Sequence, residues 1–290
     1  MTAAPRFAVF GHPIAHSLSP RLHALFAAQT GIELEYIAID AAPAALAAVV
    51  RNFFDAGGMG ANVTVPHKAA AFAWADVRAP IAQHLGVANV LTRLPDGRIE
   101  ADSNDGAGLL ADLGGRCGIE VSDRSVLLLG AGGAARAAAF VLLDAGVCRL
   151  VIANRTPERA RTLAAALADP LRVQVKRWDE LDHLDVPDLI VNATSAGVQH
   201  AALALPASLV GLRTFAYDLS YGAAATPFTD WADSAGCAAA FDGLGMLVET
   251  AAASFARWHG VRPDTDAALR MLRDLRTPVA VEGRSYRKPV

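Results

Sequence analysis

Short runs of hydrophobic residues alternate with longer Ala- and Leu-rich stretches along almost the whole chain. The short runs are rich in β-branched and apolar residues and end in turn-forming residues, which is typical of strands. The stretches between them are about ten or more residues long, as expected of helices. The predicted strands cover residues 7–10, 35–40, 61–65, 87–94, 125–130, 149–154, 172–178, 189–194, 214–220 and 238–243. Strands that alternate with helices predict βαβ units, mainly parallel sheets and an α/β fold.

One helix has a well-marked start and end, in the run SLSPRLHALFAAQTG. Ser19 is placed to cap this helix, and Pro20 suits its first position, where no backbone N–H is needed. Gly31 is expected to end it. A domain boundary is predicted near residue 106, where turn residues precede a new helix and the strongly apolar strand at 125–130.

Composition excludes several classes of protein. The 290 residues are 53% hydrophobic and 19% charged, which suits two globular domains with substantial cores. The net charge of −3 provides no basic footprint for nucleic acid or an anionic membrane. The basic run at 284–290 is expected to be a solvated tail. Residues 189–212 lack charges but contain many polar side chains, so we expect a strand and loop there and no membrane span.

The three cysteines indicate a reducing compartment. Cys117, Cys148 and Cys237 are far apart and show no C-x-x-C spacing, so neither a disulfide framework nor a zinc site is expected. His12 and His16 are separated by a proline that rules out a regular helix presenting both, and no metal site is predicted. The N-terminus has no secretory signal pattern, and we expect a cytoplasmic protein.

The run SVLLLGAGGAARAAAF carries the strongest local motif. A strand leads directly into a G-x-G-x-x-A turn and a helix, the context that dinucleotide binding requires. Gly130 permits the turn, Gly132 lets the backbone approach a pyrophosphate, and Ala135 allows close packing of the helix. The free N–H groups of the helix N-terminus would face the phosphates. The alternative is a strand–helix turn without a ligand.

The end of the next strand selects the cofactor. An NAD enzyme usually has an acidic residue there, which would repel a 2′-phosphate. This chain has instead Asn154, Arg155, Thr156 and, one helical turn later, Arg159. Guanidinium groups pair well with phosphate, so we predict NADP. Thr156 followed by Pro157 is also a helix start, and both roles can hold.

Polar residues at strand ends and turns mark a second site in the first half. Ser17 and Ser19 lie at a loop-to-helix junction, where an anion is favoured, although Ser19 could serve only as a cap. Thr64 and Lys68 follow a strand, where open α/β sheets bind ligands. Other polar candidates near strand ends or turns are Asn89, Asp102, Asn104 and Asp105. Taken singly, each of these could be an ordinary turn residue.

Together these motifs resemble one family, the shikimate dehydrogenases with their quinate/shikimate relatives. The resemblance runs from residue 7 to about residue 265 and rests on nine runs in order. These are FGHPIAHSLSP, GANVTVPHK, GVANVL, DSNDG, GAGGAAR, NRT, NATSAG, YDLSYGAAATPF and DGLGMLV. Nine ordered motifs are far more specific than any one of them.

The resemblance implies an N-terminal α/β substrate domain with a mixed, mainly parallel sheet, formed by residues 1–105 plus 243–290. Residues 106–242 would form a Rossmann-type NADP domain. It also implies the reaction, in which NADPH reversibly reduces 3-dehydroshikimate to shikimate in aromatic amino acid biosynthesis. A small-molecule substrate is the only partner expected besides the cofactor. A monomer and a homodimer both remain open.

The resemblance also assigns residues to roles. Its catalytic pair falls on Lys68 and Asp105. Its substrate positions fall on Ser17, Ser19, Thr64, Asn89, Asn104, Tyr221 and Thr250. Its cofactor positions fall on Gly130, Ala131, Gly132, Gly133, Ala134, Asn154, Arg155, Thr156, Arg159, Thr194, Leu219 and Gly243. Hydride transfer to a ketone leaves an alkoxide that a lysine can protonate, and a carboxylate can hold that lysine in place.

The sequence departs from the family pattern at two substrate positions. Asn104 stands where the family has threonine, and Thr250 stands where it has glutamine. One hypothesis is that a longer Asn104 and a shorter Thr250 compensate within one pocket and keep a polar pair. The alternatives are drift at a tolerant rim or a changed substrate, such as quinate or a related polyol acid. A silent nucleotide-binding regulator is a third possibility, and the intact Lys68–Asp105 pair argues against it.

Overall fold

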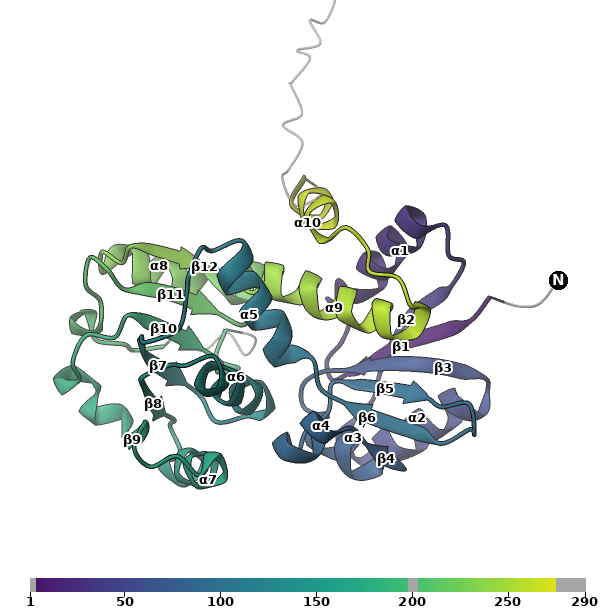
Figure 1. Ribbon diagram of the computed structural model, residues 1–290, viewed down its shortest axis with the longest axis horizontal. Coiled ribbons are helices and arrows are strands. Elements are labelled where there is room, and N and C mark those ends of the chain that lie inside the picture. The colour runs from purple at the N-terminus through teal and green to yellow at the C-terminus, as the bar shows by residue number, and fades with distance from the viewer. Residues whose placement is uncertain (1–3, 198–202, 275–290) are drawn as a thin grey trace, which may run out of the picture.

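The structure, a computed structural model, describes residues 4–197 and 203–274. Figure 1 shows two lobes, each built around its own sheet, with helices α5 (Asp105–Gly115) and α9 (Leu244–His259) running between them. The basic run at 284–290 lies outside the described residues. No helix in the described part of the chain has the length and apolar character needed to cross a membrane.

The first lobe contains a mixed six-stranded sheet, in the order β2-β1-β3-β5-β6-β4. The strands are β1 (Arg6–Gly11), β2 (Glu35–Asp40), β3 (Gly58–Val63), β4 (Val77–Arg78), β5 (Val90–Arg93) and β6 (Ile99–Asp102). Strand β1 pairs in parallel with β2 and β3, whereas β5 runs antiparallel to both β3 and β6. The mixed sheet expected for the substrate lobe is confirmed.

The sequence pattern predicted the type of this sheet correctly, but it predicted the bounds of its strands less well. Strand β3 starts three residues earlier than predicted and ends at Val63, because the chain turns at Thr64–His67. The strand predicted at 87–94 is shorter at both ends. Strands β4 and β6 were missed, since each is very short and β6, with the sequence IEAD, has no continuous apolar run.

Helices cover both faces of the first sheet. They are α1 (Ser19–Thr30), α2 (Leu46–Asp55), α3 (Lys68–Trp74) and α4 (Pro80–Leu85), with a 3₁₀ turn η1 (Pro43–Ala45). Helix α1 ends as predicted at Gly31, which has a left-handed φ of 70°. The cap predicted at Ser19 is wrong, because Leu18 holds the N-cap position and Ser19 is the first helical residue. The Ser19 hydroxyl is therefore not committed to capping.

The second lobe contains a parallel six-stranded sheet, in the order β12-β11-β10-β7-β8-β9. The strands are β7 (Ser125–Leu129), β8 (Arg149–Ala153), β9 (Val173–Lys176), β10 (Leu189–Asn192), β11 (Phe215–Asp218) and β12 (Ala239–Phe241). The helices are α6 (Gly133–Asp144), α7 (Pro157–Leu167) and α8 (Thr226–Ser234), with 3₁₀ turns η2 (Trp178–His183), η3 (Ala207–Leu209) and η4 (Gly222–Ala224). This is the predicted Rossmann-type architecture.

Two apolar layers sandwich the parallel sheet. Residues of α5, α6 and α7 pack on one face, around Leu128 and Ile152. Residues of α8, η2 and η3 pack on the other face, around Leu127 and Ile190. Alternate residues of one strand therefore serve opposite faces, as expected for a sheet that is buried on both sides.

Helices α5 and α9 cross at very short range. A Cβ atom on Gly108 of α5 would lie 2.2 Å from Thr250 Oγ1 and 3.2 Å from the carbonyl oxygen of Met246, both on α9. Beyond this crossing, α9 packs against α1 and α10 (Thr265–Asp274) in a separate apolar cluster that includes Leu22 and Phe255. Helix α9 thus extends from the junction between the lobes into the first lobe (Figure 1).

We predict that Gly108→Ala lowers the free energy of unfolding by about 1–3 kcal/mol, because the added methyl group overfills the α5–α9 contact. Urea denaturation would measure the change. Gly114→Ala is the matched control, since it lies on the same helix and a Cβ there would meet nothing within 4 Å. The control should be neutral or slightly stabilising, because alanine favours helix over glycine. Equal effects of the two substitutions would contradict the close crossing.

Candidate active site

Polar residues from several segments meet at one edge of the mixed sheet. The parallel strands β1 and β3 end at this edge, and antiparallel β5 begins there, with Val90 paired to Asn62 and to Asp102. The segments that follow β1, β3 and β6, and the one that precedes β5, therefore converge. They carry Ser17, Ser19, Thr64, Lys68, Asn89, Asn104 and Asp105. The fold brings these predicted residues to the same side of the sheet.

Lys68 and Asp105 form the ion pair at the centre of this edge. Lys68 Nζ lies 2.5 Å from Asp105 Oδ2, and the two side chains are only 12% and 9% exposed. Each is the first residue of a helix, α3 and α5 respectively. A carboxylate suits that position because it faces the positive end of the helix dipole. Burial of both partners makes this pair much less accessible to screening by salt than a surface pair.

Asn89 holds the second oxygen of the Asp105 carboxylate. Its Nδ2 donates to Asp105 Oδ1 at 2.8 Å and to Asn104 Oδ1 at 2.7 Å. Its Oδ1 accepts from the backbone N–H of Asn104 at 2.9 Å. Asp105 therefore has an ammonium on one oxygen and an amide on the other, and its orientation is defined from both sides.

Asn104 and Thr250 do not pair through their side chains as hypothesised. Asn104 Nδ2 donates to the backbone carbonyl of Thr250 at 3.1 Å and to Ser254 Oγ at 3.0 Å. The Thr250 hydroxyl is buried, faces Gly108 and has no hydrogen-bond partner among the described residues. The proposed exchange of amide and hydroxyl between the two positions is therefore wrong.

The remaining predicted substrate residues are Ser17, Ser19, Thr64 and Tyr221. The backbone N–H of Ser19 donates to Ser17 Oγ at 3.3 Å, so the two serines share one turn. Thr64 follows β3 and lies beside Gly11, at the end of neighbouring β1. Tyr221 comes from the second lobe and packs on the apolar cluster of α1, α9 and α10. Their contacts with substrate stay a prediction.

The glycine turn after β7 has the geometry of a phosphate-binding loop. Gly130 has a φ of 113°, and a Cβ there would lie 2.8 Å from the carbonyl oxygen of Ala193. A Cβ on Gly132 would meet nothing within 4 Å, so the backbone is open to a ligand on that side. Helix α6 begins at Gly133, and a Cβ there would lie 3.4 Å from Cβ of Lys68. The loop therefore lies directly against the Lys68 side chain.

Arginines flank the end of β8. Asn154 Nδ2 donates to the carbonyl of Thr156 at 2.8 Å, and α7 begins at Pro157 as predicted. Arg155 and Arg159 are exposed, and neither side chain forms an ion pair with another described residue. The nearby acidic residue Glu158 is paired with Arg161 at 3.1 Å. Positive charge is thus available where a 2′-phosphate would lie, which fits NADP.

The other predicted cofactor residues, Thr194, Leu219 and Gly243, follow the ends of β10, β11 and β12. Asn192 accepts from the Thr194 hydroxyl at 2.8 Å and donates to Asp218 Oδ2 at 2.7 Å. The backbone N–H of Leu219 donates to Asn192, and Gly243 lies where a Cβ would be 2.5 Å from the Leu219 carbonyl. Burial raises the pKa of Asp218 to about 6, and the bond from Asn192 opposes the shift.

Several of these polar residues escaped the sequence analysis. Asn192 and Asp218 sit in otherwise apolar strands, as does Asn62 in β3. Ser254 is a buried hydroxyl within the apolar stripe of α9. The available signal was a lone polar residue in an apolar run, since such a residue must find a partner when it is buried.

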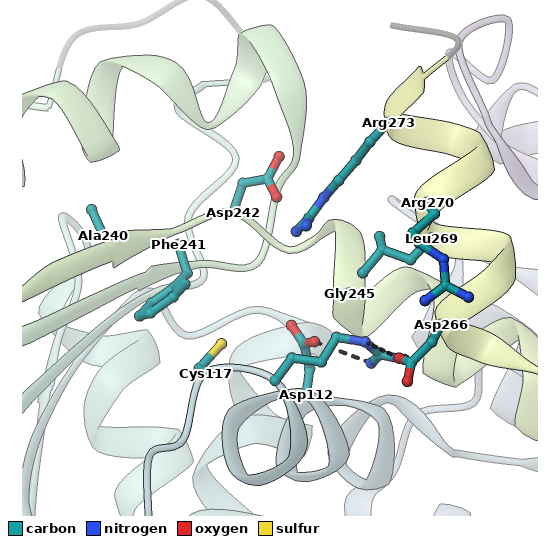
Figure 2. A pocket seen from close by; sticks show the side chains of 11 residues that line it. Asp112, Cys117, Ala240, Phe241, Asp242, Gly245, Asp266, Leu269, Arg270 and Arg273 are labelled. Carbon is teal, nitrogen blue, oxygen red and sulfur yellow. Dashed lines mark hydrogen bonds and ion pairs between the residues drawn. The ribbon is translucent and has the colours of Figure 1, made fainter.

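A separate cavity of about 560 Å³ lies between α5, α9 and α10, and Figure 2 shows its charged lining. None of the predicted site residues lines it. Arg116 bonds there with Glu249 at 2.7 Å and with Asp266 at 2.9 Å. Burial raises the pKa of Cys117 to about 12, so this thiol is protonated at neutral pH. Among residues 4–197 and 203–274, no cluster of His, Cys, Asp or Glu could hold a metal ion.

Comparison with known proteins identifies close relatives. Residues 9–91 match the family "Shikimate dehydrogenase substrate binding domain", and residues 114–202 match "Shikimate / quinate 5-dehydrogenase". The chain is 53% identical over 270 residues to a shikimate dehydrogenase (NADP(+)) of Xanthomonas campestris pathovar campestris, covering 92% of this chain and 95% of the relative.

Solved structures give the same result. An Ael1 enzyme from Pseudomonas putida superimposes with a TM-score of 0.84 at 45% identity, over 93% of this chain and 98% of that one. Shikimate 5-dehydrogenase from Thermus thermophilus, in complex with NADP(H) and shikimate, superimposes with a TM-score of 0.82 at 35% identity. That match covers 93% of this chain and 99% of the other. The likeness therefore spans both lobes.

The raised pKa of Asp218 predicts a pH-dependent contribution to stability. Between about pH 4 and pH 6 the folded chain holds a proton on Asp218 that the unfolded chain has released, so stability falls as pH rises through this window. Asp218→Asn removes this effect. The free energy of unfolding of the variant relative to the parent should therefore rise by up to about 3 kcal/mol from pH 4 to pH 7. Urea titrations at several pH values would measure it, and a constant difference would contradict the shift.

Proposed function

Because this chain belongs to the shikimate dehydrogenase family, we propose that it catalyses the reversible, NADP-dependent reduction of 3-dehydroshikimate to shikimate. One observation carries the proposal: the buried Lys68–Asp105 pair lies directly beside the glycine turn, with Gly133 against the lysine side chain. A proton donor and a dinucleotide loop are thus brought together from two lobes. No observation favours quinate, another polyol acid or a silent regulatory role.

The second lobe is suited to hold the cofactor, which when bound supplies the hydride. The open side of Gly132 and the N-terminus of α6 would receive the pyrophosphate. Asn154, Arg155, Thr156 and Arg159 would receive the 2′-phosphate. The segments at Thr194, Leu219 and Gly243 would hold the nicotinamide end.

Lys68 is the proton donor in this scheme. As negative charge develops on the substrate carbonyl oxygen, the ammonium stabilises it and transfers a proton, and in the reverse direction the neutral amine accepts one. One N–H of the ammonium bonds Asp105, which leaves the others for the substrate oxygen. Asp105 orients the lysine, and Asn89 orients Asp105.

The first lobe would bind the rest of the substrate. We assign the substrate carboxylate to the Ser17 and Ser19 hydroxyls, and the ring hydroxyls to residues near Thr64, Asn89 and Tyr221. This assignment divides the chain into a substrate domain, residues 1–105 plus 243–290, and an NADP domain, residues 106–242. We further propose that the enzyme acts in the cytoplasm, as a monomer or a homodimer.

The proposal is tested by steady-state assays with shikimate and quinate, each with NADP and NAD. Strong NADP-dependent turnover of shikimate is expected. Lys68→Ala should lower kcat at least about 100-fold, the usual scale of acid–base catalysis, and change KM far less. Lys176→Ala, on β9 in the other lobe, is the matched control and should keep kcat. Near-normal kcat in Lys68→Ala would remove this lysine from the mechanism.

The cofactor assignment has its own test. Arg155→Ala and Arg159→Ala should each raise KM for NADP about 10- to 100-fold, because each removes a charge-assisted bond to the 2′-phosphate. Weak activity with NAD, which lacks that phosphate, should change little. Arg177→Ala replaces an exposed arginine of the same lobe that is paired with Asp179, and serves as control. Parallel losses with NADP and NAD would overturn the assignment.

A further inference from the structure

Ser254, which no sequence motif marked, lies at the junction of a buried hydrogen-bond network behind the catalytic pair. The residue is on α9 and is fully buried. Its Oγ accepts from Asn62 Nδ2 at 2.8 Å and from Asn104 Nδ2 at 3.0 Å. The hydroxyl donates in turn to the Thr250 carbonyl at 3.1 Å. All the bonding capacity of a serine hydroxyl is used.

One arm of this network leads through β3 to β2 in the first lobe. Asn62 on β3 accepts from the Tyr36 hydroxyl at 2.8 Å and also donates to the Asn89 carbonyl at 3.3 Å. Burial raises the pKa of Tyr36 well above its usual value, so its hydroxyl keeps its proton and donates. This arm orients the amide of Asn62, so both Asn62 hydrogens point to Ser254 and Asn89.

The other arm leads to the reacting groups. Asn104 uses both amide hydrogens on Ser254 and on the Thr250 carbonyl, and its Oδ1 accepts from Asn89. Asn89 donates its second amide hydrogen to Asp105, which holds Lys68. A continuous chain of bonds therefore runs from Ser254 through Asn104, Asn89 and Asp105 to Lys68 Nζ.

We propose that Ser254 is a positioning residue for proton transfer, acting through Asn104, and that Asn104 is a brace for Asn89 and Asp105 and contributes no donor to the substrate. The inference rests on the proposed function. Every donor of Asn104 is consumed within the protein, so the family position it occupies has changed its task in this chain. Ser254 is the group that makes the change possible, because a long amide at position 104 needs a buried acceptor.

The physical consequence of losing the hydroxyl is local. In Ser254→Ala, Asn62 and Asn104 would each retain a buried N–H without its acceptor, which is costly enough to rotate an amide. Rotation of Asn104 would withdraw the acceptor from Asn89, and Asn89 would no longer define the orientation of Asp105. Lys68 would then be displaced from the substrate oxygen, and displacements of about 1 Å can cost about 100-fold in rate.

The first experiment separates positioning from stability. Ser254→Ala should lower kcat with shikimate and NADP about 10- to 100-fold, with KM for both within about threefold. Thr214→Val is the matched control: its buried hydroxyl also makes two bonds, accepting from Gly211 N–H and donating to the Pro187 carbonyl, away from the site. The control should lower the melting temperature and keep kcat. If Ser254→Ala lowers only the melting temperature, the proposal is wrong.

A double-variant cycle tests the route. If Ser254 acts through Asn104, Ser254→Ala combined with Asn104→Ala should lose no more kcat than Asn104→Ala alone. Losses that multiply would overturn the route. Ser254→Thr keeps the hydroxyl and should restore most of the rate, whereas Ser254→Cys, a weak acceptor of similar size, should not. The Cys variant also replaces the Ala variant if that one fails to fold.

Failure of this inference is distinct from failure of the proposed function. If the parent protein does not oxidise shikimate with NADP, the proposed function falls. If the parent is active and kcat is unchanged in both Ser254→Ala and Ser254→Cys, only the positioning role falls.

Discussion

The close crossing of α5 and α9 is the constraint on which the rest of the structure depends. It is possible because two contact positions are glycines: a side chain on Gly108 would collide with Thr250, and one on Gly245 would lie 1.9 Å from Asp112 Oδ1. Helix α5 begins at Asp105, and α9 carries Ser254, so the distance between the two helices sets the distance between these groups. Any widening of the crossing would separate Asn104 from its acceptors on α9.

Burial of polar groups at this crossing makes each side chain dependent on the next. Asp112 is buried, accepts from the Tyr217 hydroxyl at 2.6 Å and lies 3.3 Å from Arg116. Burial raises the pKa of Asp112, while the bonds from Tyr217 and Arg116 oppose the rise. The same logic holds for the Asn89–Asn104–Ser254 chain at the other end of α5. Buried networks of this kind favour one geometry because an unpaired member is costly.

The two lobes contact each other where the glycine turn of one lies beside the lysine of the other. The glycine turn belongs to the parallel sheet and the lysine to the mixed sheet, yet Gly133 lies against Lys68. Both of these edges are formed by the carboxyl ends of parallel strands, where helix N-termini and turn residues gather. A hydride donor held at one edge would therefore lie close to a proton donor held at the other.

Features that depend on neighbouring residues in the chain were readable from the sequence. The glycine turn, the α7 start at Pro157 and the end of α1 at Gly31 follow from backbone geometry within a few residues. The α/β class follows from alternating periodicities. The short strands β4 and β6 could not be predicted from the sequence, because two to four residues carry too little periodic signal. The Ser19 cap was wrong because the helix begins one residue earlier than its polar signature indicated.

What the sequence determined by itself was the set of chemical groups and the order in which they follow the strands, including Lys68, Asp105 and the arginines after β8. Only the tertiary structure decided which atoms bond. It directed the Asn104 amide to the Thr250 carbonyl and Ser254, and it left the Thr250 hydroxyl against Gly108. The reason is physical. Residues 104 and 254 are far apart in the chain, and their contact exists only because two helices cross at a distance that glycine permits.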